Sequence, residues 1–204
     1  MVDETLDLWL VRHGETDWNA EHRVHGQKNS QLSQLGRKQA EVLARRLQNE
    51  TFDRIYSSDS ARAQDTAGAV FPKAKLCLDE RLRELSYGVL EGKTYAEFTP
   101  AEGAMRQAMY ADPLNRRADG GETWLELIAR VSDWLTSLPK SGRVIAFSHG
   151  GTIRAAVFSF IDPPKAYEWN LTFGNTGITR LRLNEASKVI VTLNDTAHLE
   201  GFDG

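Results

Sequence analysis

The sequence has few of the features that would place a protein in a membrane or in an oxidising compartment. It contains one cysteine, Cys77, so no disulfide can form within the chain. The apolar run around Cys77 predicts a buried, unreactive thiol. No apolar stretch approaches the length of a membrane span, and the first residues lack the basic and apolar regions of a signal peptide. These absences favour a soluble protein of the cytoplasm that does not bind membranes.

An excess of charge of one sign is also missing. The chain carries 25 basic and 28 acidic residues, a formal net charge of −3, and no long run of lysine and arginine. A broad basic surface for nucleic acid is therefore not expected. An anionic ligand would have to be bound locally, by individual arginine side chains. With 204 residues, of which 41% are hydrophobic, the chain is typical of one globular domain, and we expect a monomer or a homodimer.

Strand-like runs alternate with helical patterns, which is typical of an α/β fold with a parallel sheet covered by helices. The predicted strands are residues 7–12, 54–57, 75–78, 143–148, 177–183 and 188–194. A polar turn separates the last two runs, which predicts a hairpin and an antiparallel edge of the sheet.

Helices are predicted from apolar periodicity and from capping residues. After Ser33, apolar residues recur at helical spacing as far as Leu47. Thr123 and Glu126 form a capping-box pattern before a second apolar stripe, which stops ahead of Pro139. Packing against a core explains this stripe better than a cofactor platform does.

Residues 91–122 differ from the rest of the chain because they are rich in glycine and proline. Long irregular insertions in compact domains are usually functional. We therefore predict a cap-like helical insertion here, over one edge of the sheet, within a single domain of residues 1–204.

The strongest chemical signal follows the first predicted strand, which leads directly into Arg12, His13, Gly14 and Glu15. Enzymes of the α/β class place their chemistry at the carboxyl ends of parallel strands. This turn delivers an imidazole next to a guanidinium, and we interpret His13 as a nucleophile that handles phosphate.

Three later segments have a similar layout. Arg62 stands in the predicted first turn of a helix, and His149 precedes Gly150 at the start of another, where free N–H groups favour phosphate binding. Glu84 lies among apolar neighbours, where a carboxyl group can stay protonated and act as an acid. Each residue alone also has an ordinary structural explanation, such as a core histidine or a surface ion pair of Arg62 or Glu84. All of these segments together fit one phosphate-binding site, and this favours the functional interpretation.

Five motifs in this order resemble the histidine phosphatase superfamily, the phosphoglycerate mutase-like proteins, over nearly the whole chain. The matching segments are residues 10–16 with Trp18 and Asn19, residues 57–59 with Arg62, Glu84 with Tyr87 and Glu91, residues 120–123, and residues 148–151. The resemblance implies a three-layer α/β/α sandwich with a mostly parallel central sheet, an antiparallel edge strand and a helical insertion. It also implies a two-step phosphoryl transfer that needs no metal and no cofactor.

The resemblance assigns roles to individual residues. His13 would attack phosphorus while Arg12, Arg62 and His149 hold the phosphate oxygens. Glu84 would protonate the leaving oxygen and then activate water. Asn19 and the N–H group of Gly150 are secondary contacts to phosphate.

Other residues are candidates for reading the substrate. They are Arg23 and His25 at the expected pocket entrance, Tyr87, and the pair Arg116 and Arg117 in the insertion. His22 and His25 lack the partners of a zinc site, so no metal is expected. His25 and Asn29 stand where the family often carries Gln and Asp, which leaves the substrate open.

The favoured function is hydrolysis of a small phosphate monoester through a phosphohistidine on His13, of the histidine acid phosphatase type. Mutases of this family are longer, with a larger insertion and an extended tail. Arg116 and Arg117 could nevertheless bind a second acidic group, and so a cofactor-dependent phosphoglycerate mutase is the alternative. A module that binds phosphorylated ligands without turnover is the third reading, which the complete set of residues disfavours.

Overall fold

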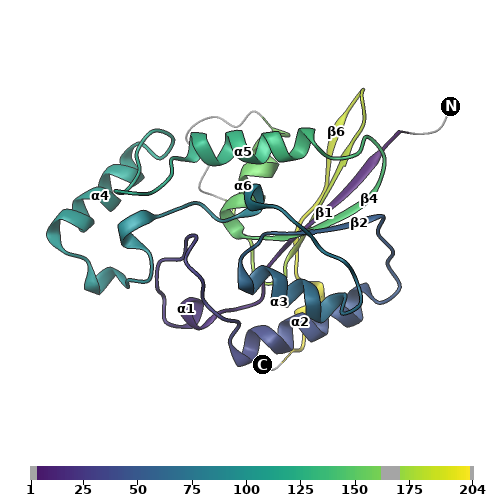
Figure 1. Ribbon diagram of the computed structural model, residues 1–204, viewed down its shortest axis with the longest axis horizontal. Helices are drawn as coiled ribbons and strands as arrows, with labels where there is room; N and C mark the ends of the chain where they lie inside the picture. The colour runs from purple at the N-terminus through teal and green to yellow at the C-terminus, as the bar shows by residue number, and fades with distance from the viewer. Residues whose placement is uncertain (1–3, 162–170, 203–204) are drawn as a thin grey trace.

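The computed structural model describes residues 4–161 and 171–202, and its centre is a six-stranded sheet in the order β3-β2-β4-β1-β5-β6 (Figure 1). The strands are β1 (Leu6–Arg12), β2 (Arg54–Ser57), β3 (Cys77–Leu78), β4 (Gly142–Ser148), β5 (Ile178–Leu183) and β6 (Lys188–Asp195). Pairing is parallel from β3 to β1, and β5 runs antiparallel to both of its neighbours. The predicted hairpin of the last two strands is confirmed.

Helices cover both faces of the sheet, so the fold is the expected three-layer α/β/α sandwich. They are α1 (Asp17–Ala20), α2 (Gln34–Leu47), α3 (Ala61–Val70), α4 (Pro100–Ala111), α5 (Trp124–Thr136) and α6 (Gly150–Phe158). Leu8 and Leu10 of β1 face α5 and α6, whereas Trp9 and Val11 face α2 and α3 (Figure 1). A central strand buried on both faces reads as a continuous apolar run, which is why β1 shows no alternation in the sequence.

Strand register brings three functional segments to one edge of the sheet. Arg12 at the end of β1 pairs with Ser148 at the end of β4, and Ser57 at the end of β2 pairs with Phe147. His13 and His149 are therefore the first residues beyond neighbouring parallel strands. This carboxyl edge is where α/β folds bind ligands.

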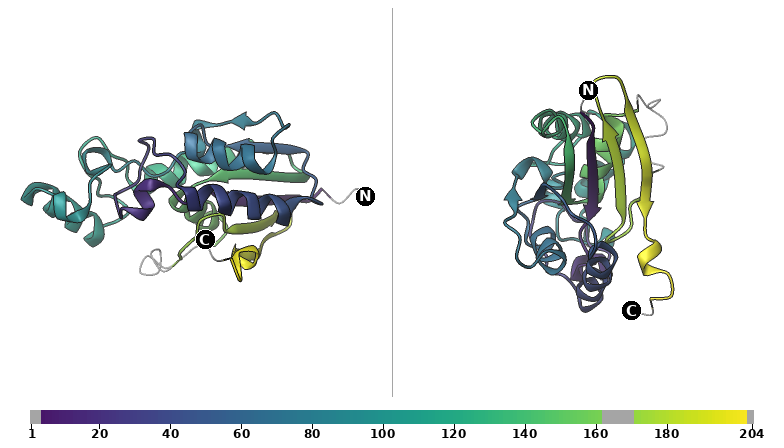
Figure 2. Two further views of the ribbon diagram at one scale, coloured as in Figure 1. Left: turned by 90° about the horizontal axis from the view of Figure 1, so that it is seen from below. Right: turned by 90° about the vertical axis from the view of Figure 1, so that its right-hand side faces the viewer.

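The predicted insertion contains a 3-10 helix at Tyr95–Glu97 and the helix α4. Both views place α4 at the end of the molecule opposite the start of β1, beyond the carboxyl edge of the sheet (Figure 1; Figure 2, left). Thr99 caps α4 in a capping box with Glu102, and Pro100 occupies its first position. The insertion thus extends the side of the molecule on which the strands end.

The prediction of a buried thiol at Cys77 is wrong, because this cysteine is free and exposed. The expected strand of residues 75–78 is reduced to the two residues of β3, both exposed, at the edge of the sheet. An edge strand this short has no helix over its side chains, so an apolar sequence does not imply burial. In the part of the chain that the structure describes, no helix has the length and apolarity to cross a lipid bilayer.

A close approach between backbones joins α2 to the turn that carries His13. A Cβ atom on Gly36, in the first turn of α2, would lie 1.9 Å from the carbonyl oxygen of Glu15. Ser33, the N-cap of α2, donates its N–H to the same oxygen at 3.0 Å. Only glycine at position 36 allows α2 to pack this closely against the turn.

We expect Gly36→Ala to lower the free energy of unfolding by about 1–3 kcal/mol, because a methyl group must push the two backbones apart. Gly68→Ala is the matched control: no described atom lies within 4 Å of its Cβ position. Because Gly68 is inside α3, that change should stabilise by up to about 1 kcal/mol. Urea unfolding of the three proteins measures both effects, and equal midpoints for wild type and Gly36→Ala would contradict the tight fit.

Candidate active site

His13 is the first residue after β1 and is only 3% exposed. Its Nδ1 lies 2.7 Å from the carbonyl oxygen of Gly14, an atom that can only accept, so Nδ1 carries the proton. Nε2 is then unprotonated and accepts a hydrogen bond from Nε of Arg62 at 3.2 Å. The fold therefore holds the imidazole in the tautomer whose lone pair faces a guanidinium.

Arg62, in the first turn of α3, is fully buried and binds two histidines and a loop. Besides His13, its Nη2 donates to Nδ1 of His149 at 3.0 Å. The carbonyl oxygens of Gly26 and Lys28 accept from Nη2 and Nη1 at 2.7 and 3.0 Å. No described carboxylate forms an ion pair with Arg62, so the surface pairing considered for it does not occur. A buried cation held only by neutral acceptors keeps its charge for an anionic ligand.

His149 is the N-cap of α6 and is completely buried. Because Nδ1 accepts from Arg62, the proton is on Nε2, which lies 3.0 Å from Oγ of Ser58 and 3.1 Å from Oγ of Ser60. The rings of His149 and His13 are 5.1 Å apart, centre to centre. Both histidines are neutral in this network.

The positive charge of the site is carried by its arginines, and its histidines are neutral. Burial lowers the pKa of His13 and of His149 well below 6.5, and the nearby positive charges of Arg62 and Arg12 lower both further. The same causes lower the pKa of His25 to about 3. Burial also lowers the pKa of Arg62, to about 10, which leaves the guanidinium charged at neutral pH. The histidines are thus available as uncharged nucleophile or ligand, whereas positive charge stays on Arg12 and Arg62.

Arg12 lies beside the start of α6. Its Nη1 donates to the carbonyl oxygen of Phe173 at 2.5 Å, and its Nε is buried without a partner among the described residues. A Cβ on Gly150 would lie 3.7 Å from this Nε. Gly150, at the start of α6, and the guanidinium of Arg12 therefore border the same space.

The carboxylate of Glu84 is held by two backbone amides. Gly151 donates its N–H to Oε2 at 3.0 Å, and Leu85 donates to Oε1 at 2.8 Å. A Cβ on Gly151 would lie 2.2 Å from Oε1, so the carboxylate can occupy this position only opposite a glycine. The second glycine of the Ser-His-Gly-Gly segment is explained by this contact.

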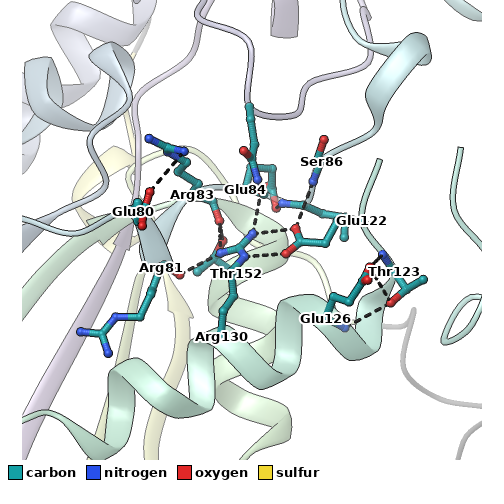
Figure 3. A network of polar contacts seen from close by, with 12 residues as sticks. Glu80, Arg81, Arg83, Glu84, Ser86, Glu122, Thr123, Glu126, Arg130 and Thr152 are labelled. Atoms are coloured by element: carbon teal, nitrogen blue, oxygen red, sulfur yellow. Dashed lines mark hydrogen bonds and ion pairs between the residues drawn. The ribbon is translucent and has the colours of Figure 1, made fainter. Parts of the chain in front are cut away.

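Arg130, on α5, holds the backbone that carries Glu84 (Figure 3). Its guanidinium donates to the carbonyl oxygens of Arg81, Arg83 and Glu84 at 2.7 to 2.9 Å. It also binds both carboxylate oxygens of Glu122, at 2.7 and 2.9 Å. This arrangement explains why the segment of residues 120–123 belongs with the other motifs: Glu122 orients the arginine that anchors Glu84.

Glu91 holds the loop that surrounds Arg62. It is 6% exposed, and its two carboxylate oxygens accept from the N–H groups of Gln27 and Lys28 at 3.0 and 2.9 Å. A Cβ on Gly26 would lie 1.9 Å from Oε1 of Glu91. The acid thus fixes the two carbonyl groups that bind Arg62.

A cavity of about 290 Å³ opens next to Glu84. It is lined by Arg23, Val24, His25, Glu84, Tyr87, Leu90, Tyr95, Phe98, Arg106, Met109, Tyr110, Pro113 and Trp124. A smaller hollow of about 150 Å³, on which Arg62 and His149 also border, shares Glu84 with it. In the described part of the chain, no three histidine, cysteine or acidic side chains are grouped as metal ligands would be.

Only some of the residues predicted to contact the substrate line the cavity. Arg23, His25 and Tyr87 line the cavity, whereas Arg116 and Arg117 are exposed and do not line it. Arg117 forms an ion pair with Glu126. Asn19 completes the capping box of α1 by accepting from the N–H of the N-cap residue Thr16, and its amide oxygen lies 3.4 Å from Nδ2 of Asn175.

Sequence reasoning missed three arginines close to the site: Arg106, Arg130 and Arg154. Arg106 lines the cavity, and Arg154 is close enough to Glu84 for the carboxylate to raise the arginine pKa against the lowering by burial. All three lie on helices, where a charged residue normally indicates a solvated face. The one sequence feature that could have led to any of them is the motif at residues 120–123. That motif contains Glu122, the partner of Arg130, but not Arg130 itself.

Comparison with known proteins decides the family. The model of the "Histidine phosphatase superfamily (branch 1)" matches residues 8–196. The chain belongs to this superfamily. A Yersinia pestis protein named "Probable phosphoglycerate mutase GpmB" is 35% identical over 205 residues, covering 96% of this chain and 95% of that protein.

Two solved structures of this superfamily fold are similar along almost their whole length. Bacillus stearothermophilus YhfR superposes with a TM-score of 0.87 at 28% identity, covering 95% of this chain and 99% of that one. A mycobacterial glucosyl-3-phosphoglycerate phosphatase superposes with a TM-score of 0.79 at 31% identity, covering 93% and 99%. The names of the relatives thus include both a mutase and a phosphatase.

The buried neutral histidines predict a protein that loses stability in weak acid. In the unfolded chain a histidine takes up a proton near pH 6.5, but folded His13 and His149 have lowered pKa values and stay neutral. The unfolded state therefore binds more protons below that pH, and each histidine should cost up to about 2 kcal/mol between roughly pH 7 and pH 5.

Urea unfolding across this pH range measures the loss. His22→Gln is the matched control, since His22 is exposed, and it should leave the slope against pH unchanged. Ion-paired carboxylates with lowered pKa values, such as Asp59, lose their contribution only at more acidic pH. Stability that is constant or rises toward pH 5 would contradict the neutral state of the two histidines.

Proposed function

We propose that this protein is a phosphomonoesterase that needs no metal and forms a phosphohistidine on Nε2 of His13. One observation carries the proposal: His13 is buried, its Nδ1 proton is bound by the Gly14 carbonyl, and its unprotonated Nε2 faces the Arg62 guanidinium, which a phosphate oxygen can engage in place of that nitrogen. The lowered pKa keeps this nitrogen unprotonated at neutral pH. A nucleophile prepared in this way is what covalent phosphoryl transfer requires.

In the first step, Nε2 of His13 attacks phosphorus and the bond from phosphorus to the alcohol oxygen breaks. The proton of the Glu84 carboxyl group passes to the leaving oxygen. Arg12, Arg62 and the N–H group of Gly150 at the start of α6 stabilise the negative charge of the transferring group. His149 can donate its Nε2 proton to a phosphate oxygen in place of a serine.

In the second step, the Glu84 carboxylate takes a proton from water, and the resulting hydroxide attacks phosphorus. The bond between phosphorus and Nε2 breaks, which restores neutral His13 and releases inorganic phosphate. Glu84 ends the cycle protonated, ready for the next ester.

A phosphoglycerate mutase is the second candidate, and the name of the Yersinia relative at 35% identity favours it. A mutase binds the carboxylate of its substrate, which requires cations in the pocket. Of the two arginines that line the cavity, Arg23 is bound to Glu21 and Glu97, and Arg106 is stacked on Tyr95 and Tyr110. The pair Arg116 and Arg117 does not line the cavity. These contacts support hydrolysis over phosphate transfer between positions of glycerate.

We expect His13→Ala to lower kcat for p-nitrophenyl phosphate by about 10³-fold or more, because the nucleophile is lost. EDTA should leave the wild-type rate unchanged. Wild type quenched in base during turnover should carry phosphate that is labile in acid, and His13→Ala should not. The exposed His22→Ala variant is the matched control and should keep both signals.

The same assay with phosphoglycerate distinguishes the candidates. Phosphate release from simple monoesters supports the phosphatase, whereas interconversion of phosphoglycerates without release supports the mutase. A requirement for a divalent ion, or full activity without His13, would overturn the mechanism.

Gly151→Ala tests the placement of Glu84. Its methyl group would overlap Oε1 of Glu84 and displace the carboxylate, so we expect kcat to fall by about 10- to 100-fold. In Gly150→Ala the new Cβ meets Arg12 at an ordinary 3.7 Å, so its loss should be smaller. Equal activities of the two variants would show that the position of Glu84 does not limit the reaction.

A further inference from the structure

The cavity beside Glu84 indicates which alcohol the phosphate is attached to. If Glu84 protonates the leaving oxygen, the rest of the alcohol extends from Glu84 into the space that this residue lines. Glu84 lines two hollows, and the smaller one is bordered by Arg62 and His149, to which the proposed function assigns the phosphate. The cavity of about 290 Å³ is then the space for the alcohol. This inference therefore rests on the proposed function.

Aromatic rings are the largest group of side chains in the cavity wall. They come from Tyr87, Tyr95, Phe98, Tyr110 and Trp124, and Val24, Leu90, Met109 and Pro113 add further apolar lining. Burial and the charge of Glu84 both raise the pKa of Tyr87, so its phenol stays neutral. Aromatic surfaces of this kind bind planar apolar groups by edge-to-face and stacked contacts.

Two basic residues of the cavity, Arg23 and His25, are already bound or uncharged. Arg23 binds Glu21, Glu97 and the carbonyl oxygen of Gly92. His25 shares a hydrogen bond of 2.9 Å with Thr16, and its pKa of about 3 leaves it uncharged. A short polar hydroxy acid would find little to bind at these positions.

Arg106 takes part in the aromatic wall. Its guanidinium lies 3.8 Å from the ring centre of Tyr95 and 4.7 Å from that of Tyr110. A guanidinium stacked in this way presents a flat, weakly hydrated face and extends the platform of the two tyrosines. Tyr95 and Tyr110 are 57% and 61% exposed, which leaves apolar surface at the cavity for a ligand to cover.

We propose that the preferred substrates are phosphate monoesters of alcohols that carry an aromatic ring, and that the ring binds between Tyr87, Phe98 and the platform of Tyr95, Arg106 and Tyr110. The volume suits such a group, because an apolar protein cavity of about 150 Å³ accommodates benzene. A cavity of about 290 Å³ has room for one ring with its linker or for a fused pair of rings.

Three esters with similar alkoxide leaving groups test the preference: benzyl phosphate, cyclohexylmethyl phosphate and methyl phosphate, with 3-phosphoglycerate as the acidic comparison. Because the intrinsic reactivities are similar, differences in kcat/KM report binding of the organic group. We expect benzyl phosphate to exceed methyl phosphate by about 10-fold or more and to exceed the cyclohexyl ester by a smaller factor. Equal values for benzyl and methyl esters, or the highest value for 3-phosphoglycerate, would overturn the proposal.

Substitutions in the cavity wall test where the aromatic ring of the substrate binds. Tyr95→Ala and Arg106→Ala should each lower the ratio of the benzyl to the methyl rate constant by about 3- to 10-fold. Leu125→Ala is the control, since Leu125 is 49% exposed on α5 and does not line the cavity. It should keep the wild-type ratio, and an unchanged ratio in both cavity variants would place the ring elsewhere and contradict the proposal.

Phosphonates separate this inference from the proposed function, since they cannot be hydrolysed. Calorimetric titration with phenethylphosphonate and propylphosphonate should show about 10-fold tighter binding of the aromatic compound. If no ester is hydrolysed but this difference is found, the ring site stands and the phosphatase proposal fails. If esters are hydrolysed through His13 without any aromatic preference in rate or binding, the phosphatase proposal stands and the ring site fails.

Discussion

The site depends on one buried cation. The guanidinium of Arg62 binds His13, His149 and two carbonyl groups of the loop at residues 26–28. Burial of this charge is costly, and the neutral acceptors, together with the attraction of the nearby Glu84 and Glu91 carboxylates, offset part of that cost. A carboxylate paired directly with the guanidinium would weaken the positive potential at His13. Burial of Arg62 therefore lowers the stability of the fold and produces a positive potential at the Nε2 atom of His13.

The surrounding chain is built to hold this cation and the acid opposite it. Glu91 fixes the loop that binds Arg62, and Arg130 fixes the backbone of Glu84. Glycine is required at two of these contacts: Gly26 lies against Glu91, and Gly151 lies against Glu84. These supports belong to different elements, so the geometry of the site is a property of the folded domain rather than of any one segment.

The sequence was sufficient for the parts that depend on local pattern. Apolar runs ending in charged turns gave five of the six strands within one residue at each end, and the parallel order followed from alternation with helices. His13, Arg12, Arg62 and His149 were grouped because each stands at the end of a strand, just beyond one, or at a helix start, and the structure brings them together.

What the sequence could not provide depends on packing between distant segments. Arg130 reaches carbonyl groups 46 to 49 positions away, and nothing near it in the chain indicates this. Arg117 and Arg106 lie in the same insertion, but only the fold places Arg106 against the cavity. The apolar run around Cys77 predicted burial. The thiol is exposed because its strand lies at the edge of the sheet.

The uncharged state of His13 and His149 has a consequence for the pH dependence of ligand binding. Because positive charge resides on Arg12 and Arg62, which keep their protons throughout the physiological range, the positive part of the electrostatic potential in the pocket hardly varies with pH. Phosphate monoesters, by contrast, change from monoanion to dianion near pH 6. Under the proposed function, the ionic form of the ester therefore contributes a pH dependence of affinity to which the two arginines add none.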